Sequence, residues 1–347
     1  MNKTTAAFTA VILVVVVLLS SYGVYRFYVP SGNESQGEPV TIVDATGAQV
    51  NVTLPVERIV SLNPGLTEII CALDCEDRIV GHDENSVFPV SVSEKPVAGQ
   101  NSYDPNLEVL LEMEPDVIVA DSMLSYNTEA LDKLATAGLP VIIEEPSNVS
   151  RVKIVTSNFG LIFGKEEKAA EINDYISSYE NFVNERVKDL ASSEKPAVYI
   201  EWYQPWQTFT EDSAASEIMV NAGGVNIAAE ITTTAPVLSP EYVVEKNPDI
   251  IVRMISGDLI GNATGFEATY NELMNRAGLG EVTAIKEGKV YVYDPIVLEG
   301  IRYPVGLLYW AKWFHPSLFE DVDPAAVHAE LIQQFFSVTL EGVHTYP

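Results

Sequence analysis

Apolar residues recur in the same pattern in two segments, one in each half of the chain. Residues 107–120 have the sequence LEVLLEMEPDVIVA, and residues 240–253 have PEYVVEKNPDIIVR. In each segment the apolar spacing predicts a helix, which must end before the proline because proline disfavours the α conformation in the preceding residue. The β-branched run that follows is typical of a buried strand in a parallel sheet. One such helix–strand unit in each half predicts two similar α/β lobes.

Further apolar runs add strands and helices to both lobes. RIVSL at 58–62 predicts a buried strand, and the next residues predict a helix with Asn63 as its cap and Pro64 in its first turn. AVYIE at 197–201 predicts the first strand of the second lobe, and KVYVYD at 289–294 predicts a later one.

Residues 165–190 carry the strongest helical pattern of the chain. Apolar residues recur there at steps of three and four, and neither proline nor glycine interrupts them. A helix of this length extends about 39 Å at roughly 1.5 Å per residue, which is enough to join two lobes. We therefore expect an N-terminal lobe at 39–163, a bridging helix at 164–193 and a C-terminal lobe at 194–347.

The N-terminal segment has the pattern of a membrane-embedded helix. Residues 4–25 contain no charged side chain and are long enough to cross a hydrocarbon core of about 30 Å. No cysteine follows them to accept a lipid, and the polar stretch SGNESQGE comes next. These features predict an anchor at 1–29 and a linker at 30–38, with the body on the outer face of the membrane. Cleavage as a signal peptide is the alternative.

Composition narrows the possible functions. The 347 residues can form two domains of ordinary size, and the net charge is −29, from 49 acidic and 20 basic residues. This balance argues against nucleic acid as a partner. The acidic residues are spread along the chain, as on a solvated surface.

Few residues suggest catalysis, a metal site or a disulfide framework. The only cysteines are Cys71 and Cys75, and the four histidines are scattered. Four residues apart on one helix, the two thiols are too distant for a relaxed disulfide, but Asp74 can end the helix and permit one. A disulfide and two packed thiols therefore both remain open. The chain has no nucleophile-elbow or zinc-protease motif, so we expect a protein that is not an enzyme and has no cofactor or metal site of its own.

Several segments resemble one known family, the solute-binding proteins of ABC importers for iron chelates and cobalamin. The resemblance covers about residues 40–340. It implies two α/β lobes joined by one rigid helix, a ligand held between them, and delivery to a membrane permease driven by an ATPase. The segments that carry it are ERIVSLNPGLTEII, NLEVLLEMEPDVIVA, AGGVNIA, LSPEYVVEKNPDIIV and RYPVGLLYWAKWFHPSLF.

The resemblance does not specify the ligand, because siderophore, cobalamin and haem binders share the scaffold. Cobalamin binders of the family often carry an aromatic residue before the helix of the second repeated segment. The corresponding segment here, TTTAPVLSPE, has none, which favours a siderophore-type iron chelate over a corrinoid. A receptor for a bare metal ion and an enzyme or assembly subunit on the same fold are the alternatives.

The ligand-binding candidates are aromatic residues and arginines near strand ends. In α/β lobes, ligands lie beyond the carboxyl ends of the strands. For the aromatic residues the alternative role is packing between the lobes, and for the arginines it is a structural ion pair. The resemblance implies that an arginine near Arg302 faces the ligand. The candidates are Tyr103, Trp202, Tyr203, Trp206, Arg253 and Arg302.

Glu108 and Glu241 occupy matching positions in the two repeated segments. The resemblance implies that each glutamate points from its lobe toward arginines of the permease and that the pair sets the docking register. The alternative is that each carboxylate only stabilises the N-terminal turn of its helix, where negative charge is favoured by about 0.3–1 kcal/mol.

Overall fold

The structure is a computed structural model that describes residues 39–211, 213–233 and 235–347. The predicted anchor and linker lie outside these residues. Within the described part, no helix is both long and apolar enough to cross a membrane. Residues 40–347 form one compact unit.

The first lobe is built on a five-stranded parallel sheet with the order β5-β4-β3-β6-β7. A hairpin of β1 (Pro39–Val43) and β2 (Gln49–Thr53) precedes it. The sheet strands are β3 (Ile59–Ser61), β4 (Ile79–Asp83), β5 (Val97–Gly99), β6 (Val117–Ala120) and β7 (Val141–Ile143). The helices are α2 (Pro64–Ala72), α3 (Val90–Ser93), α4 (Leu107–Glu112), α5 (Thr128–Thr136) and α6 (Val149–Phe163).

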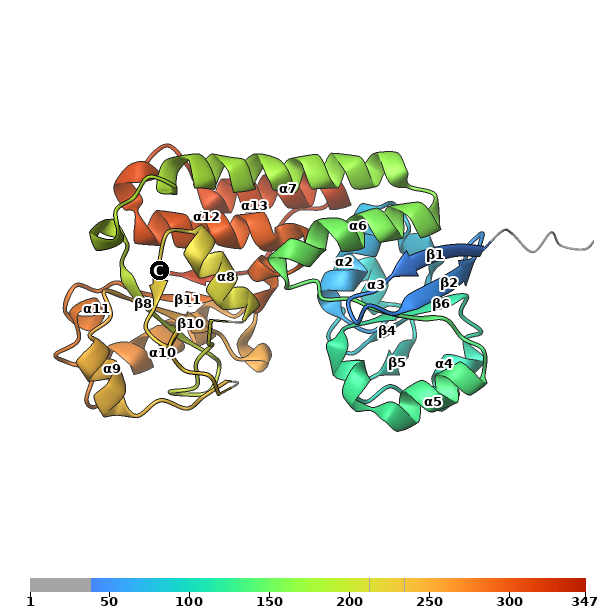
Figure 1. The fold of residues 1–347 in the computed structure, drawn as a ribbon, viewed down its shortest axis with the longest axis horizontal. Helices are drawn as coiled ribbons and strands as arrows, with labels where there is room; N and C mark the ends of the chain where they lie inside the picture. Colours follow the sequence, from blue (N-terminus) through green and yellow to red (C-terminus); the bar gives the residue numbers. More distant parts are fainter. Residues whose placement is uncertain (1–38, 212, 234) are drawn as a thin grey trace, which may run out of the picture. The chain divides into compact units, whose positions relative to one another are not determined.

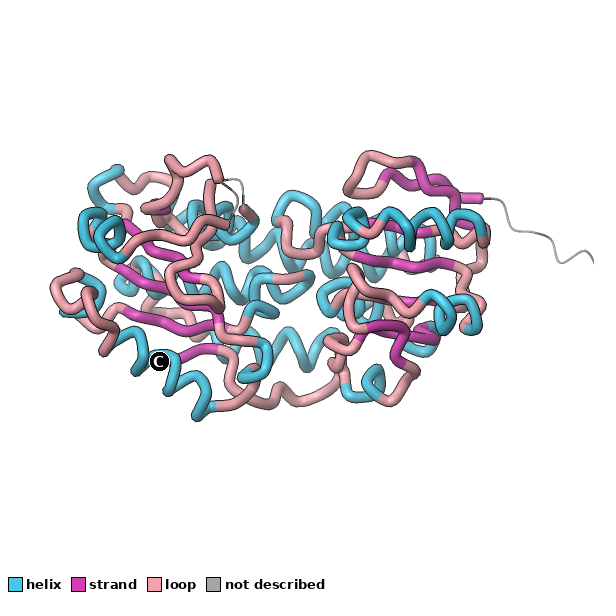
Figure 2. Tube along the Cα trace, turned by 90° about the horizontal axis from the view of Figure 1, so that it is seen from below, coloured by secondary structure: helices cyan, strands magenta, loops and turns pink. Residues whose placement is uncertain are grey.

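The second lobe has the sheet order β12-β11-β10-β8-β9, parallel except for the edge strand β12. Its strands are β8 (Ala197–Glu201), β9 (Val225–Asn226), β10 (Ile250–Met254), β11 (Val290–Tyr293) and β12 (Thr345–Tyr346). Its helices are α8 (Ala214–Asn221), α9 (Pro240–Lys246), α10 (Ala263–Met274), α11 (Thr283–Lys286), α12 (Tyr303–Phe314) and α13 (Pro324–Phe336). Figure 2 shows the strands gathered in two separate groups, with helices around and between them.

Short 3₁₀ helices complete the described chain. They are η1 (Glu76–Arg78), η2 (Ser122–Tyr126), η3 (Ser192–Glu194), η4 (Gly257–Leu259), η5 (Pro295–Leu298), η6 (Gly300–Arg302) and η7 (Pro316–Leu318).

One long helix, α7 (Glu166–Val187), runs past both lobes (Figure 1). Its apolar stripe, including Ile172, Ile176 and Val183, is buried, as the periodicity predicts. On the second-lobe side, the Tyr303 hydroxyl of α12 donates a hydrogen bond to Glu180 of α7 at 2.9 Å. The predicted fold class, two α/β lobes with a long helix along both, is confirmed.

The repeated segment has the same structural role in each lobe. The carboxylate of Asp116 accepts hydrogen bonds from the backbone N–H groups of Glu57 and Arg58, just before β3, both at 2.8 Å. Asp249 accepts from the N–H of Ala197, at the start of β8, also at 2.8 Å. Each aspartate therefore fixes the start of the neighbouring strand.

The two cysteines are free, buried thiols, so no disulfide joins Cys71 and Cys75. Cys71 lies in α2 and Cys75 just after it, with Asp74 between them in a left-handed conformation. Burial raises the pKa of both thiols. Of the two alternatives left open by the sequence, packed thiols are the one observed.

Candidate functional site

The loops after four strands, two from each sheet, line one cavity of about 1130 Å³. Asn63 and Glu84 follow β3 and β4 in the first lobe, while Gly257 and Asp294 follow β10 and β11 in the second. Parallel α/β sheets bind ligands at this edge of the strands. The volume lies slightly above the usual range for ligand sites, roughly 300–1000 Å³, and is therefore suited to a bulky ligand.

Apolar side chains form the walls of this cavity, and several are open to solvent. Val87 and Val90 come from the first lobe, and Ile260 comes from the second; all three are exposed large apolar residues. Residues 337–341 of the C-terminal segment add a further wall. Exposed apolar residues that converge on a cavity provide the flat contact that an organic ligand needs.

A buried ion pair lies at the floor. Arg302 Nε donates to Glu68 Oε2 at 2.7 Å, and each residue is only 2% exposed. Burial raises the pKa of Glu68 despite the opposing effect of Arg302. Arg302 Nη1 lies 3.1 Å from His328 Nε2, and its guanidinium stacks over the ring of Phe88. Arg302 therefore lines the cavity with much of its hydrogen-bonding capacity already used.

The neighbouring His328 accepts that hydrogen bond as a neutral imidazole. Burial, together with Arg302 and His344, lowers the pKa of His328 to about 2. His328 Nδ1 is buried and has no hydrogen-bond partner among the described residues. His328 therefore adds no charge beside Arg302 at neutral pH.

Glu299 brings a further carboxyl to the floor, beside Gly65 of α2. No hydrogen bond to this carboxyl occurs within the described residues. Burial, followed by the charges of Glu68, Asp121, Asp294 and Glu145, raises its pKa to about 8. At neutral pH the group is therefore largely protonated, and it becomes charged in mildly alkaline solution.

The elevated pKa of Glu299 predicts a pH-dependent contribution to stability. The folded protein holds this proton more tightly than the unfolded chain, whose pKa is 4.5. The stabilising effect is complete below that value and is lost as pH rises toward 8. Glu299→Gln should leave the unfolding midpoint unchanged in acid and raise it at alkaline pH, by about 2–4 °C per kcal/mol gained.

Thermal unfolding across this pH range tests the prediction. Glu112→Gln, which removes the same charge from an exposed position at the end of α4, is the matched control. A midpoint that falls equally with pH in the parent and in Glu299→Gln would contradict it.

The predicted aromatic loop follows β8, at the carboxyl edge of the second sheet, outside the lining of the cavity. Trp202 packs against Tyr203, with ring centroids 5.0 Å apart, and against Phe209 at 5.6 Å. Trp206 lies 4.9 Å from the Arg276 guanidinium and packs on the second-lobe core. Tyr203 is 41% exposed and is the most accessible of the three predicted side chains.

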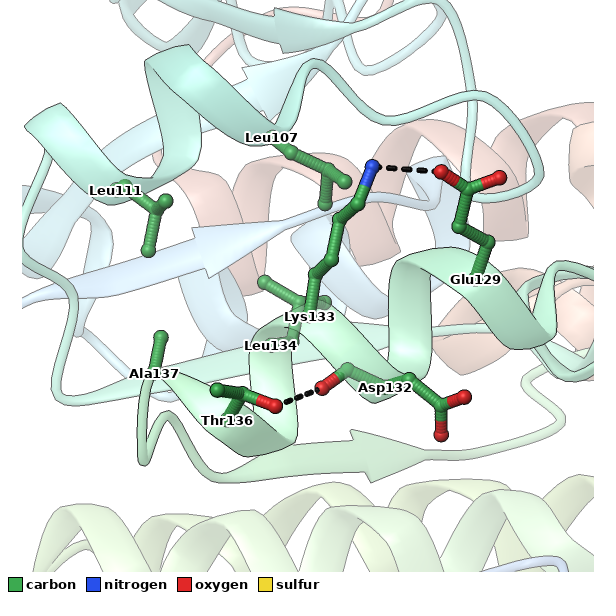
Figure 3. A pocket seen from close by; sticks show the side chains of 8 residues that line it. All are labelled: Leu107, Leu111, Glu129, Asp132, Lys133, Leu134, Thr136 and Ala137. Carbon is green, nitrogen blue, oxygen red and sulfur yellow. Dashed lines mark hydrogen bonds and ion pairs between the residues drawn. The ribbon is translucent and has the colours of Figure 1, made fainter.

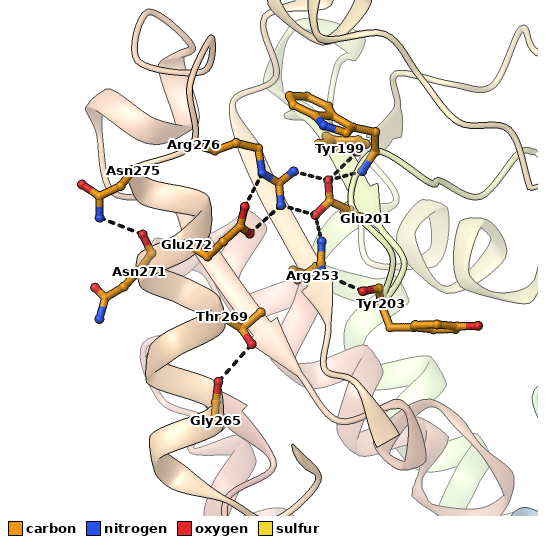
Figure 4. A network of polar contacts seen from close by, with 11 residues as sticks. Tyr199, Glu201, Tyr203, Arg253, Gly265, Thr269, Asn271, Glu272, Asn275 and Arg276 are labelled. Carbon is orange, nitrogen blue, oxygen red and sulfur yellow. Dashed lines mark hydrogen bonds and ion pairs between the residues drawn. The ribbon is translucent and has the colours of Figure 1, made fainter. Parts of the chain in front are cut away.

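A buried network holds this loop in place (Figure 4). The Glu201 carboxylate forms ion pairs with Arg253 and with Arg276, whose Nη2 lies at 2.8 Å. It also accepts the Trp206 N–H at 2.8 Å. Arg253 Nη2 donates to the backbone carbonyl of Tyr203 at 2.6 Å. Arg253 thus occupies the structural ion pair that the sequence left open as its alternative role.

Burial and the nearby Arg276 lower the pKa of Arg253 to about 10, so its guanidinium remains charged at neutral pH.

Tyr103, the first-lobe candidate, is 48% exposed on the loop after β5, and its backbone carbonyl accepts a hydrogen bond from the Asn127 side-chain amide at 2.8 Å. Arg302 alone among the predicted ligand-binding residues lines the cavity.

Sequence reasoning missed most of the residues that line the cavity. These side chains come from separate parts of the chain and line the same cavity only after the chain has folded. Glu84 and Asp294 each come directly after a strand, and an acidic residue in that position is the signal that could have found these two. The missed residues include Glu68, Glu84, Phe88, Asp294, Glu299 and Glu341.

A second hollow, of about 470 Å³, lies between α4 and α5 in the first lobe (Figure 3). Leu107 and Leu111 line one side of it, and the exposed pair Lys133–Glu129 spans 2.7 Å at its rim. It lacks the convergent polar groups that orient a ligand, so the cavity between the lobes is the better candidate.

This architecture, two α/β lobes along one long helix with a cavity at the strand ends of both, is that of a solute-binding protein. The chain belongs to the periplasmic binding protein family, whose profile matches residues 59–297. Membership places it among binding proteins that work outside the cytoplasmic membrane with an ABC transporter. The prediction of a substrate-binding protein of this type is therefore confirmed.

Individual relatives agree with this assignment. An ABC transporter substrate-binding lipoprotein of Bacillus subtilis is 28% identical, with 92% of this chain and 100% of the relative covered. A cobalamin-binding protein of Halobacterium salinarum is 26% identical, with 75% and 72% covered. The crystal structure of the TroA-like periplasmic binding protein FepB from Veillonella parvula matches with a TM-score of 0.73 and 25% identity, over 89% of this chain and 99% of that one.

Proposed function

We propose that this chain captures a bulky corrinoid or iron chelate in the cavity between its lobes and delivers it to an ABC permease driven by an ATPase. The observation that carries the proposal is the cavity itself, which has exposed apolar walls and a polar floor at the strand ends of both lobes. The metal belongs to the transported ligand, and the chain performs no chemistry and needs no cofactor. Residues 1–29 anchor the body to the outer face of the membrane.

A corrinoid is the first ligand to test. A relative that covers three quarters of this chain is named as a cobalamin-binding protein, which offsets the preference for an iron chelate drawn from the TTTAPVLSPE segment. Titration of the full-length protein in detergent with cyanocobalamin and with ferric trihydroxamates should show saturable one-to-one binding to at least one of them. Binding of bare metal ions alone would favour the metal-ion receptor, and turnover of a bound ligand would favour an enzyme.

A charge placed on the cavity wall should weaken binding. Val90 is 71% exposed and lines the cavity, so Val90→Asp should leave the fold intact and put a carboxylate against the apolar ligand face. We expect at least tenfold weaker binding by isothermal titration calorimetry, or about 1.4 kcal/mol.

The matched control is Val43→Asp, on the β1–β2 hairpin, where Val43 is 50% exposed and does not line the cavity. Its affinity should equal that of the parent. Equal weakening by both substitutions, or by neither, would remove this wall from the binding site.

A further inference from the structure

Acidic side chains predominate in the cavity. Five aspartate and glutamate side chains line it, against one arginine and one histidine. Arg302 is engaged by Glu68 at 2.7 Å, and His344 Nδ1 lies 2.9 Å from Asp294 Oδ2. No described cation lies within ion-pair distance of the three remaining carboxyls. Those three are Glu84, Glu299 and Glu341.

Other arginines near the same strand ends are also paired. Arg253 and Arg276 both bind the carboxylate of Glu201, the last residue of β8, as Figure 4 shows. Arg151 pairs with Glu144 after β7 at 2.5 Å. The guanidinium groups that could recognise an anion are therefore already bound to carboxylates of the protein.

This distribution of charge restricts the ligands that can enter. An anionic chelate, such as a ferric tris-catecholate, needs arginine or lysine partners, and charged groups that lose water without gaining a partner are strongly disfavoured. Beside ionised carboxylates it also meets direct repulsion. A chelate with amide N–H donors or a positive group finds acceptors on the same surface.

We propose that the cavity selects metal chelates of neutral or positive net charge and that its three carboxyls without a described ion pair, Glu84, Glu299 and Glu341, together set this selection. The inference rests on the proposed capture of a chelate in this cavity. Glu299 is suited to the role because it lies at the floor, between η5 and η6, with its carboxyl free of any described ion pair.

The test compares ligands that differ only in charge. A ferric trihydroxamate with a pendant ammonium can be used as the free cation, as the neutral N-acetyl derivative and as the anionic N-succinyl derivative. Cyanocobalamin and its monocarboxylate form a second series. Binding to the full-length protein is measured above pH 8, where the Glu299 carboxyl is ionised.

We expect the anionic member of each binding series to bind at least tenfold more weakly than its neutral or cationic counterpart. Equal or tighter binding of the anion would overturn the selection and leave chelate capture intact. If no member of either series binds, chelate capture itself has failed. The two failures are therefore distinguishable.

Variants show which carboxyls cause the discrimination by ligand charge. Glu299→Gln should weaken binding of the cationic trihydroxamate at least tenfold more than that of the neutral derivative, while Glu112→Gln changes neither. If Glu299→Gln does not fold, Glu341→Gln on the exposed C-terminal segment supplies the same comparison. If corrinoids bind and trihydroxamates do not, the cationic aquacobalamin and the neutral cyanocobalamin replace the trihydroxamate pair. Unchanged discrimination in the folded variant would overturn the assignment to these carboxylates.

Discussion

Replacing Glu108 and Glu241 together with alanine should abolish ligand-dependent transport while leaving ligand affinity and folding nearly unchanged. Glu108 lies in the first turn of α4 and Glu241 in the first turn of α9. Both are exposed, and neither forms an ion pair with any described residue. Because each helix runs antiparallel to the strand that follows it, both glutamates lie at the strand edge that carries the cavity.

The physical reason is charge complementarity with the permease, which the family resemblance implies. Two exposed carboxylates, one on each lobe, can set the orientation of docking if the distance between them is constant. The long helix α7 packs along both lobes and supports that constancy. Such charge pairs act mainly on orientation and encounter rate, and their effect should decrease with added salt.

Transport is measured in vesicles that contain the permease and its ATPase, with the full chain supplied at the outer face. The matched control is Glu112→Ala with Glu245→Ala, which removes two exposed glutamates from the opposite ends of the same two helices. The control should transport like the parent. Full transport by the Glu108/Glu241 double variant would show that these glutamates only stabilise helix starts.

Breaking the ion pair at the cavity floor should cost the largest amount of stability. Arg302→Met leaves the Glu68 carboxylate buried without its partner, a change that typically destabilises a protein by about 3–5 kcal/mol. The substitution also removes the hydrogen bond to His328 and the stacking on Phe88. Urea unfolding should therefore show a much lower midpoint for Arg302→Met than for the parent.

A double variant tests whether the loss of stability comes from the unpaired Glu68 carboxylate. Glu68→Leu with Arg302→Met replaces both charges by apolar groups and should recover most of the lost stability, because no buried charge remains unpaired. The prediction would be contradicted if Arg302→Met cost less than about 1 kcal/mol, or if the double variant were less stable than the single one. Ligand affinity of the folded double variant then shows whether Arg302 also contacts the ligand.

The sequence by itself determined the features that depend on local spacing. The period of apolar residues predicted α7 and its buried face, and Asn63 caps α2 as expected, accepting the Leu66 N–H at 3.0 Å. The repeated segment predicted a second lobe like the first. These features can be predicted from the sequence because helix and strand periods, caps and proline effects act within a few residues.

Only the tertiary structure decided which side chains meet. Glu68 and Arg302 are 234 positions apart, yet they form the floor of the cavity. Arg253 lies one residue before the end of β10, and its partner Glu201 comes from the neighbouring strand and holds the aromatic loop. The packing of Cys71 and Cys75 as separate thiols also depended on their surroundings. Partners of this kind follow from distances between elements in space, which the spacing of residues along one chain does not encode.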